Sequence, residues 1–425
     1  MTERLLQYIW QFQYFNKNGL CTIDDQVLSI IHPGTYNVNQ GPDFLNGKIK
    51  VGDTLWAGSI ELHINTSDWQ QHRHSSDKNY KNVILHVVWK NDVRLELFPT
   101  LELQPIVSKL LLTKYSALLD NAQFIPCEKQ LCNVDLLTVT VWKERLVIER
   151  LQQKVSYIDG LLKQNNYHWE ETFWWMLARN FGIKINSDVF EKIAQTIPVN
   201  ILAKHKAQLL QVEAILMGQA GLLDKNFKED YPIMLQKEYR FLQKKYKFKR
   251  VSEPLFFLRM RPSNFPTIRL AQLAVMVHEG KQLFSQVKDI HHLPDVEKLF
   301  VVTANDYWHY HYVFDELSAY KKKTTGKQMV DNIIVNTVVP LLFSYGYFNT
   351  NEELKNKALD WLRNVTAESN SITNSFRTLG IENASAWDSQ ALLYLKKEYC
   401  GNKRCLQCAI GNEILAPMHE RRTGK

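Results

Sequence analysis

Two short motifs in the N-terminal part of the chain carry the side chains best suited to chemistry. Gly41-Pro42-Asp43-Phe44 holds a carboxylate after a Gly-Pro turn, and Gly58-Ser59-Ile60-Glu61-Leu62-His63 holds a second carboxylate and an imidazole. Two converging carboxylates bind hard cations such as Mg²⁺ and leave positions for water and a phosphate oxygen. Asp43 and Glu61 are therefore predicted ligands of Mg²⁺ or Mn²⁺, and His63 is predicted to orient or deprotonate the attacking water.

A sheet must position these groups. Alternating or compact apolar runs bounded by Gly, Asn and Asp predict strands over 27–32, 47–51, 54–65 and 82–89. Alternation within the third strand places Glu61 and His63 on one face, lining a cleft, and the apolar residues on the other. A hairpin through Gly52-Asp53 would bring Asp43 close to Glu61. The alternative is a capped turn and a polar network on an exposed sheet face.

Further imidazoles lie close by in the sequence. Five of the thirteen histidines precede residue 100. His72 and His74 are candidates for binding metal or phosphate, although an exposed loop is the simpler interpretation, which we favour for His74. His86 lies between apolar residues of an expected strand, where a hydrogen-bonded core histidine and a catalytic one are both consistent with the pattern.

The order and spacing of these elements resemble the PD-(D/E)xK nuclease superfamily. The match consists of Pro42-Asp43 followed by Glu61-Leu62-His63, with a helix before it and a strand after it. The resemblance covers only the N-terminal region. It implies that Asp43 and Glu61 bind the metal ion and that the Leu62 carbonyl contributes another ligand. His63 stands where the superfamily usually has lysine.

The wider sequence resembles a bacterial family catalogued as domain of unknown function 2851. The resemblance rests on both motifs above, on Ser67-Asp68-Trp69, on Val83-Ile84-Leu85-His86-Val87-Val88 and on the cysteine-rich C-terminus. It spans nearly the whole chain and implies a family without implying a substrate.

The C-terminal cysteines form a second constellation. Cys400, Cys405 and Cys408 are separated by four and then two residues, which suits zinc or an iron–sulfur cluster, and Cys127 or Cys132 would supply a fourth ligand. Some nucleases of the PD-(D/E)xK superfamily have a similar arrangement, with one earlier and three later cysteines. Reduced thiols at the end of a helix are the alternative, and a metal here would stabilise the fold rather than catalyse hydrolysis.

Composition defines the broad class of protein. The chain has 425 residues, of which 45% are hydrophobic and 23% charged, as expected for a globular protein of two or three domains. The N-terminal residues lack the continuous apolar core of a signal peptide, and no uninterrupted apolar run is long enough to cross a bilayer, so we expect a cytoplasmic protein without a membrane partner. Six cysteines in that compartment favour thiols or metal ligands over disulfides.

The predicted fold class is α+β. Residues 1–125 would form a nuclease-like domain with a mixed sheet and flanking helices, and residues 126–425 a larger, mainly helical domain that carries the cysteine cluster. The net charge of +8 is compatible with DNA or RNA as a partner.

The leading hypothesis is a metal-dependent nuclease-like hydrolase of nucleic-acid phosphodiesters. The alternatives are a noncatalytic nucleic-acid-binding or assembly protein on the same scaffold, and a metal-dependent hydrolase of another phosphorylated substrate.

Overall fold

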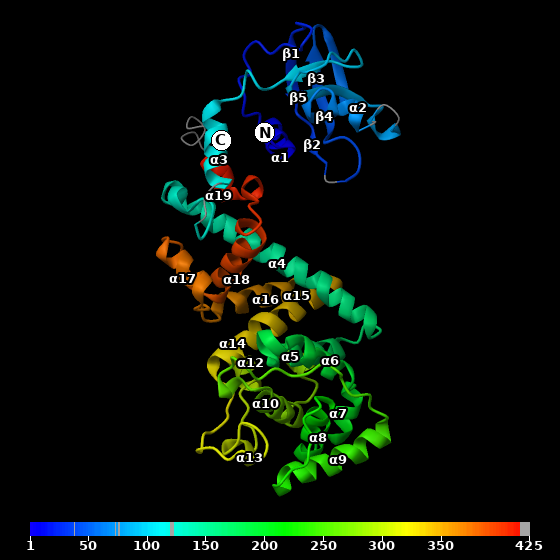
Figure 1. Ribbon diagram of the computed structural model, residues 1–425, viewed down its shortest axis with the longest axis vertical. Coiled ribbons are helices and arrows are strands. Elements are labelled where there is room, and N and C mark those ends of the chain that lie inside the picture. The colour runs from blue at the N-terminus through cyan, green and yellow to red at the C-terminus, as the bar shows by residue number, and fades with distance from the viewer. Residues whose placement is uncertain (38, 73, 75–76, 120–122, 417–425) are drawn as a thin grey trace. The chain divides into compact units, whose positions relative to one another are not determined.

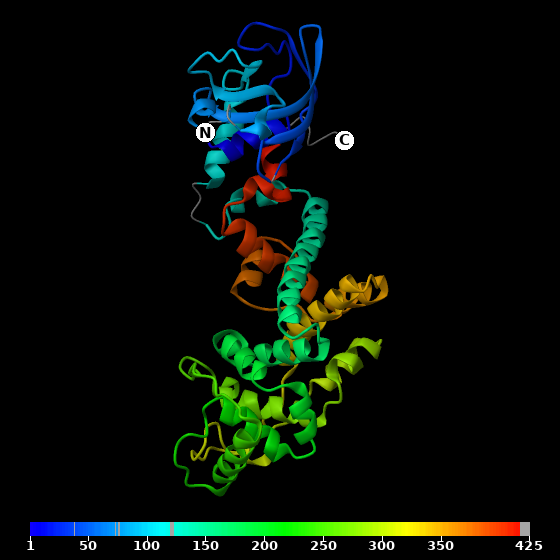
Figure 2. The ribbon, with the colours of Figure 1, turned by 90° about the vertical axis from the view of Figure 1, so that its right-hand side faces the viewer.

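A computed structural model describes residues 1–37, 39–72, 74, 77–119 and 123–416. Its contacts divide the chain into two compact units, one of Met1–Trp142 with Tyr394–Lys425 and one of Lys143–Leu393. The predicted α+β class is confirmed, because a mixed sheet with flanking helices is followed by a mainly helical region (Figures 1 and 2). The C-terminal cysteines belong to the same compact unit as the N-terminal residues. The domain boundary predicted between residues 125 and 126 would instead place them in the helical domain.

The sheet has the strand order β1-β3-β4-β5-β6, and the short β2 pairs with β3. The predicted hairpin is present, since Val51 pairs with Thr54 across the Gly52-Asp53 turn and β3 runs antiparallel to β4. On its other side β4 pairs with β5 in parallel, and β5 pairs in parallel with β6. The strands are β1 Leu28–His32, β2 Thr35–Tyr36, β3 Phe44–Val51, β4 Thr54–Asn65, β5 Val83–Lys90 and β6 Thr100–Glu102.

The parallel pairing of β4 and β5 requires a crossover, because parallel neighbours cannot be joined by a tight turn. The crossover contains helix α2 (Asp68–Gln71) and the 3₁₀ turn η2 (Lys78–Tyr80). Where the crossover ends, just before β5, the Asn82 carbonyl accepts a hydrogen bond of 2.8 Å from the Ser59 N–H of β4. A Cβ added at Gly58 would lie 2.5 Å from that carbonyl oxygen, so glycine is required where the crossover meets β4.

Helix α1 (Glu3–Gln11) packs against β4, and its apolar residues Leu6 and Ile9 are fully buried. The hydroxyl of Thr2 accepts a hydrogen bond from the Leu5 N–H and caps the helix. Apolar residues recur at helical intervals over residues 4–16, which predicts a longer helix, but α1 ends at Gln11 because Gln13 adopts a positive φ of 52°. The other helices of this unit are α3 Lys109–Leu119, η3 Glu128–Asn133, η6 Leu395–Cys400, η7 Cys405–Gln407 and α19 Ala409–Leu415.

The second unit is built from helices. The apolar pattern over residues 201–218 predicts one helix, but the structure has two, α7 (Val199–His205) and α8 (Leu209–Gln219), because Gln208 between them is extended. Lys327–Phe348 is long and apolar enough to cross a membrane, but 78% of its most apolar window is buried inside the structure, as in a core helix. The helices are α5 Trp169–Phe181, α6 Ile183–Gln195, α7 Val199–His205, α8 Leu209–Gln219, α9 Asp230–Tyr246, η4 Pro262–Asn264, α10 Pro266–Glu279, α11 Leu283–Asp289, α12 Leu293–Leu299, α13 Asp306–His309, α14 Lys327–Ile333, η5 Ile334–Val338, α15 Val339–Phe348, α16 Glu352–Asn364, α17 Ser371–Thr378 and α18 Ala386–Tyr394, with α4 Leu136–Gln164 crossing the boundary between the two units in sequence.

Candidate functional site

The site lies on β4 and β5. Glu61 and His63 are two residues apart on β4, so their side chains share one face of the sheet. Glu61 pairs with His86 of β5 in the parallel register. The exposed fractions of Glu61, His63 and His86 are 5%, 1% and 0%. These groups therefore lie inside the protein rather than on an exposed sheet face.

The crossover explains this burial. Trp69, on α2, is itself buried and places its ring 5.5 Å from the ring of His86 and 6.2 Å from that of His63. The sequence predicted one apolar and one polar face for the strand, but every residue from Gly58 to His63 is buried, because the crossover covers the polar face and α1 packs against the strand as well. The polar groups consequently interact with one another in a medium of low dielectric constant, where electrostatic interactions are strong.

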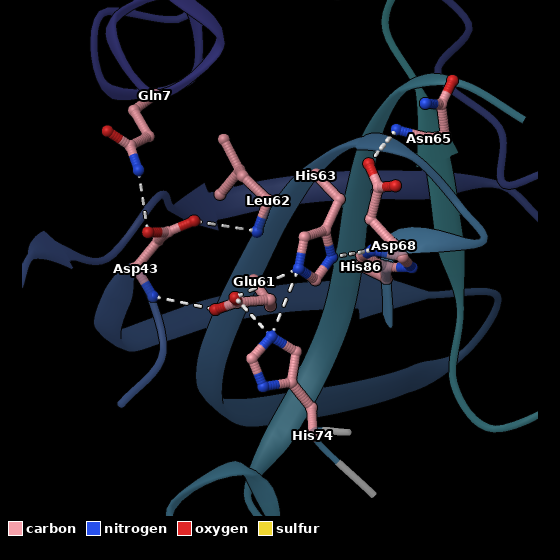
Figure 3. Close-up of polar contacts among 9 residues, drawn as sticks. All are labelled: Gln7, Asp43, Glu61, Leu62, His63, Asn65, Asp68, His74 and His86. Atoms are coloured by element: carbon pink, nitrogen blue, oxygen red, sulfur yellow. Dashed lines mark hydrogen bonds and ion pairs between the residues drawn. The ribbon is translucent and has the colours of Figure 1, made fainter. Parts of the chain in front are cut away.

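Asp43 and Glu61 are brought together, although they are far apart in sequence. Gly41 turns the chain with a φ of +108°, which side-chain-bearing residues rarely adopt, and Asp43 follows directly before β3. The main-chain N–H of Asp43 donates to Glu61 Oε2 at 3.0 Å. In return, Asp43 Oδ2 accepts a hydrogen bond from the Leu62 N–H at 3.1 Å, and Oδ1 accepts one from Gln7 Nε2 at 2.8 Å (Figure 3).

Imidazoles complete the cluster. Glu61 Oε1 lies 3.6 Å from His63 Nε2 and 3.5 Å from His74 Nε2, and these two nitrogens are 3.3 Å apart (Figure 3). His63 Nδ1 contacts His86 Nε2 at 2.8 Å. One ligand nitrogen from each of His63, His72 and His74 lies within 4.8 Å of the other two, a spacing that could hold a metal ion.

His74 departs from the exposed-loop interpretation that we favoured. Its side chain is only 11% exposed, and its ring stacks on Tyr80 with centroids 3.9 Å apart. His72 is exposed, as expected for a loop residue. The crossover thus folds one of the two loop histidines inward over Glu61.

Burial changes the acidity of both carboxyl groups. It raises the pKa of Glu61, and the neighbouring charge of Asp43 raises it further. Burial also raises the pKa of Asp43, although the hydrogen bonds that it accepts oppose the shift. A cation bound beside them would favour the ionised forms and reverse both shifts.

The imidazoles of His63 and His86 are neutral at ordinary pH. Burial, with the neighbouring His86, lowers the pKa of His63 to about 2. Burial also lowers the pKa of His86, to about 3, and that of His74. A neutral imidazole keeps a lone pair, as a metal ligand or a proton acceptor must.

Four of the predicted metal-binding cysteines come from the two chain segments of the first unit and influence one another electrostatically. Burial is the main cause of a raised pKa for both Cys127 and Cys400. The charges of Cys408 and Cys405 add to the shift of Cys127, whose pKa is raised to about 12. The charges of Cys408, Cys127 and Cys405 add to the shift of Cys400. This influence places the four thiols within electrostatic range of one another. Cys132, the alternative fourth ligand, is exposed and has its Sγ 3.9 Å from the Lys129 carbonyl oxygen.

Sequence reasoning missed one residue of the site. Gln7 contacts Asp43 from α1, and nothing in the helical pattern distinguished it from the other glutamines of that segment. His74 had a signal, because it follows His72 by two residues in a loop close to the Glu61-Leu62-His63 motif.

Fold and site together define an α+β protein with a buried carboxylate–imidazole cluster on the strand where the antiparallel and parallel parts of the sheet meet. The chain belongs to the family described as protein of unknown function (DUF2851), whose model matches residues 3–371. Neither the curated proteins nor the solved structures provide a match. The nuclease-like character of the N-terminal region remains a prediction from the sequence.

Proposed function

We propose that this protein is a metal-dependent phosphodiester hydrolase that acts on nucleic acid in the cytoplasm. The observation that carries the proposal is the convergence of Asp43 and Glu61 beside three histidines within one buried cluster. Carboxylates and imidazoles are the side chains that bind divalent cations and move protons in hydrolysis.

The cluster supplies what the reaction requires. A divalent cation held at Glu61 would polarise a phosphate oxygen and lower the pKa of a bound water. Asp43 orients Glu61 through its main-chain N–H, and its own carboxylate lies close enough to raise the pKa of Glu61. The sequence-based assignment of Mg²⁺ or Mn²⁺ to these two carboxylates remains a prediction, as does the role of His63 in activating water.

The proposal of a polymeric substrate rests on the net charge of the protein. The net charge of +8 favours association with a polyanion. DNA and RNA share the phosphodiester that the cation would activate, so both belong in the test.

A cleavage assay tests the proposal directly. Full-length protein would be incubated with single-stranded, duplex and branched DNA and RNA, in separate reactions with Mg²⁺, Mn²⁺, Zn²⁺ or Co²⁺. We expect cleavage that Glu61→Gln reduces by more than about 100-fold, because the variant removes the negative charge at the cation. Asp53→Asn is the matched control, since Asp53 is exposed on the β3–β4 turn of the same sheet.

Two outcomes would replace this proposal. Metal-independent binding without cleavage would favour a noncatalytic nucleic-acid-binding or assembly protein. Release of phosphate from small phosphorylated compounds, with nucleic acids left intact, would favour a metal-dependent hydrolase of another substrate. Cleavage that is equal in Glu61→Gln and in the wild type would overturn the site assignment.

We also propose that Cys127, Cys400, Cys405 and Cys408 hold zinc or an iron–sulfur cluster that stabilises the first unit. The proposal rests on the gathering of four buried or partly buried thiols from segments far apart in the sequence. Metal binding would deprotonate these thiols, whose pKa values burial raises, and would join the two chain segments of the unit.

A further inference from the structure

Three polar atoms converge at one point of the cluster. Glu61 Oε1, His63 Nε2 and His74 Nε2 form a triangle with edges of 3.6, 3.5 and 3.3 Å. A tetrahedral ion with ligands at about 2.0 to 2.2 Å has ligand atoms about 3.3 to 3.6 Å apart. The triangle therefore has the size that one ion bound to all three atoms requires.

These edges differ from the hydrogen bonds around them. The contact from the Asp43 N–H to Glu61 Oε2 is 3.0 Å long, and the contact between His63 and His86 is 2.8 Å long, both ordinary hydrogen-bond lengths. The triangle edges are longer than the usual hydrogen bond. The cluster thus holds its orienting contacts at hydrogen-bond distance and its converging atoms at the spacing of metal ligands.

The chemical types of these three ligand atoms indicate which class of metal ion they would bind. Two of the three atoms are imidazole nitrogens, which suit transition metals, whereas Mg²⁺ and Ca²⁺ prefer oxygen ligands. Octahedral Mg²⁺ with ligands at about 2.0 to 2.1 Å would also need shorter edges, of about 2.8 to 3.0 Å. A triangle of this size and composition is suited to Zn²⁺, Co²⁺ or Fe²⁺.

The neighbouring residues hold the three ligands in place. Glu61 Oε2 is occupied by the Asp43 N–H, which leaves Oε1 to face the imidazoles. In the tautomer that leaves a lone pair on His63 Nε2, His63 Nδ1–H donates a hydrogen bond to His86 Nε2, and the proton of His86 lies on its Nδ1. The Tyr80 ring stacks on that of His74.

We propose that Glu61, His63 and His74 bind one transition-metal ion through Oε1, Nε2 and Nε2. A tetrahedral ion with three protein ligands has one position left, which water can occupy. His63 thereby becomes a metal ligand instead of a proton acceptor, and Asp43 a positioning residue. The proposal does not depend on hydrolysis of nucleic acid.

Cobalt is a suitable probe, because tetrahedral Co²⁺ has intense visible absorption. Chelator-stripped, full-length protein would be titrated with Co²⁺ in the absence of nucleic acid, and then challenged with Zn²⁺ or Mg²⁺. We expect a tetrahedral spectrum that stoichiometric Zn²⁺ removes and a large excess of Mg²⁺ leaves unchanged. Cobalt bound to thiolates adds a charge-transfer band in the near ultraviolet. Visible bands that are lost in His74→Ala, while any such near-ultraviolet band is retained, would therefore belong to the imidazole site.

Two ligand variants complete the test. We expect His74→Ala and Glu61→Gln each to raise the Kd for Co²⁺ by more than about 100-fold, since loss of a ligand should exceed the 10- to 100-fold effect of its supporting residues. Glu61→Gln preserves the shape of the side chain, and exposed His291→Ala is the matched histidine control. An unchanged Kd in both ligand variants, or displacement by equimolar Mg²⁺, would overturn the proposal. Intact metal binding without cleavage would refute only the hydrolase.

Discussion

The main-chain N–H of Asp43 donates a hydrogen bond to Glu61 Oε2, and the Asp43 carboxylate accepts one from the N–H of the next residue, Leu62. These reciprocal contacts join the residue before β3 to the middle of β4. They fix the orientation of the Glu61 carboxylate, so that Oε1 faces the imidazoles of His63 and His74. Asp43 thus acts on the candidate site through Glu61 even where its own oxygens are occupied by protein donors.

Replacement of Asp43 should separate positioning from direct binding of the metal. We expect Asp43→Asn to weaken Co²⁺ binding and cleavage by about 10- to 100-fold, because the variant perturbs a supporting residue but keeps the main-chain contact to Glu61. Titration and cleavage assays on the same preparations provide the measurement. A loss as large as that of Glu61→Gln would show instead that Asp43 is a direct ligand.

The buried carboxyl group of Glu213, in the second unit, should make the free energy of unfolding depend on pH. It is fully buried, and burial raises its pKa to about 7, although Asn305 Nδ2 and Trp308 Nε1 donate hydrogen bonds to its carboxylate at 2.6 and 3.1 Å. The pKa of Glu213 is higher in the folded state than its unfolded value of about 4.5, so folding favours the protonated carboxyl group. The stability that protonated Glu213 contributes is therefore complete below pH 4.5 and is lost as the pH rises through 7.

Urea unfolding between pH 5 and 8 would measure this effect. We expect the free energy of unfolding of the second unit to fall with a slope of up to about 1.4 kcal/mol per pH unit from this one group. Glu213→Gln should flatten that part of the curve while lowering stability near pH 5, whereas Glu352→Gln, at an exposed position, should leave it unchanged. Parallel curves for the wild type and Glu213→Gln would contradict the assignment.

The cysteine proposal predicts a difference between two cysteines that are close in sequence. Cys127→Ser should reduce the zinc or iron content of anaerobically purified protein and lower its melting temperature, because it removes a ligand from a structural site. Cys132→Ser should do neither, since that thiol is exposed. Elemental analysis and thermal unfolding of the two variants give the comparison, and equal metal content and stability would leave the cysteines as unliganded thiols.

Gly58 should tolerate no side chain. A Cβ at this position would lie 2.5 Å from the Asn82 carbonyl oxygen and from Ile84 Cγ2, so Gly58→Ala should destabilise the first unit by about 1 to 3 kcal/mol. Gly160, within α4, has open space around it, and Gly160→Ala should stabilise that helix by about 0.5 to 1 kcal/mol. Chemical unfolding of both variants tests the contrast, and equal stabilities would contradict it.

Local sequence patterns were sufficient to predict much of the sheet. The range predicted for β4 agrees with the structure at both ends, and the Gly52-Asp53 hairpin is present, because period-two alternation and turn chemistry act between near neighbours. The same alternation placed Glu61 and His63 on one face. The end of α1 was predicted less well, because apolar spacing continued past the residue where the backbone leaves the helical region.

What the sequence by itself determined, therefore, was the chemistry carried by each element: two carboxylates, nearby imidazoles and a set of cysteines. Tertiary structure alone decided which of these groups meet. It folded His74 inward over Glu61, buried His63, added Gln7 from a distant helix, and buried Cys127 while leaving Cys132 exposed. The physical reason is that the path of a parallel crossover and the packing of a helix on a sheet depend on contacts between residues far apart in the chain, which no local pattern encodes.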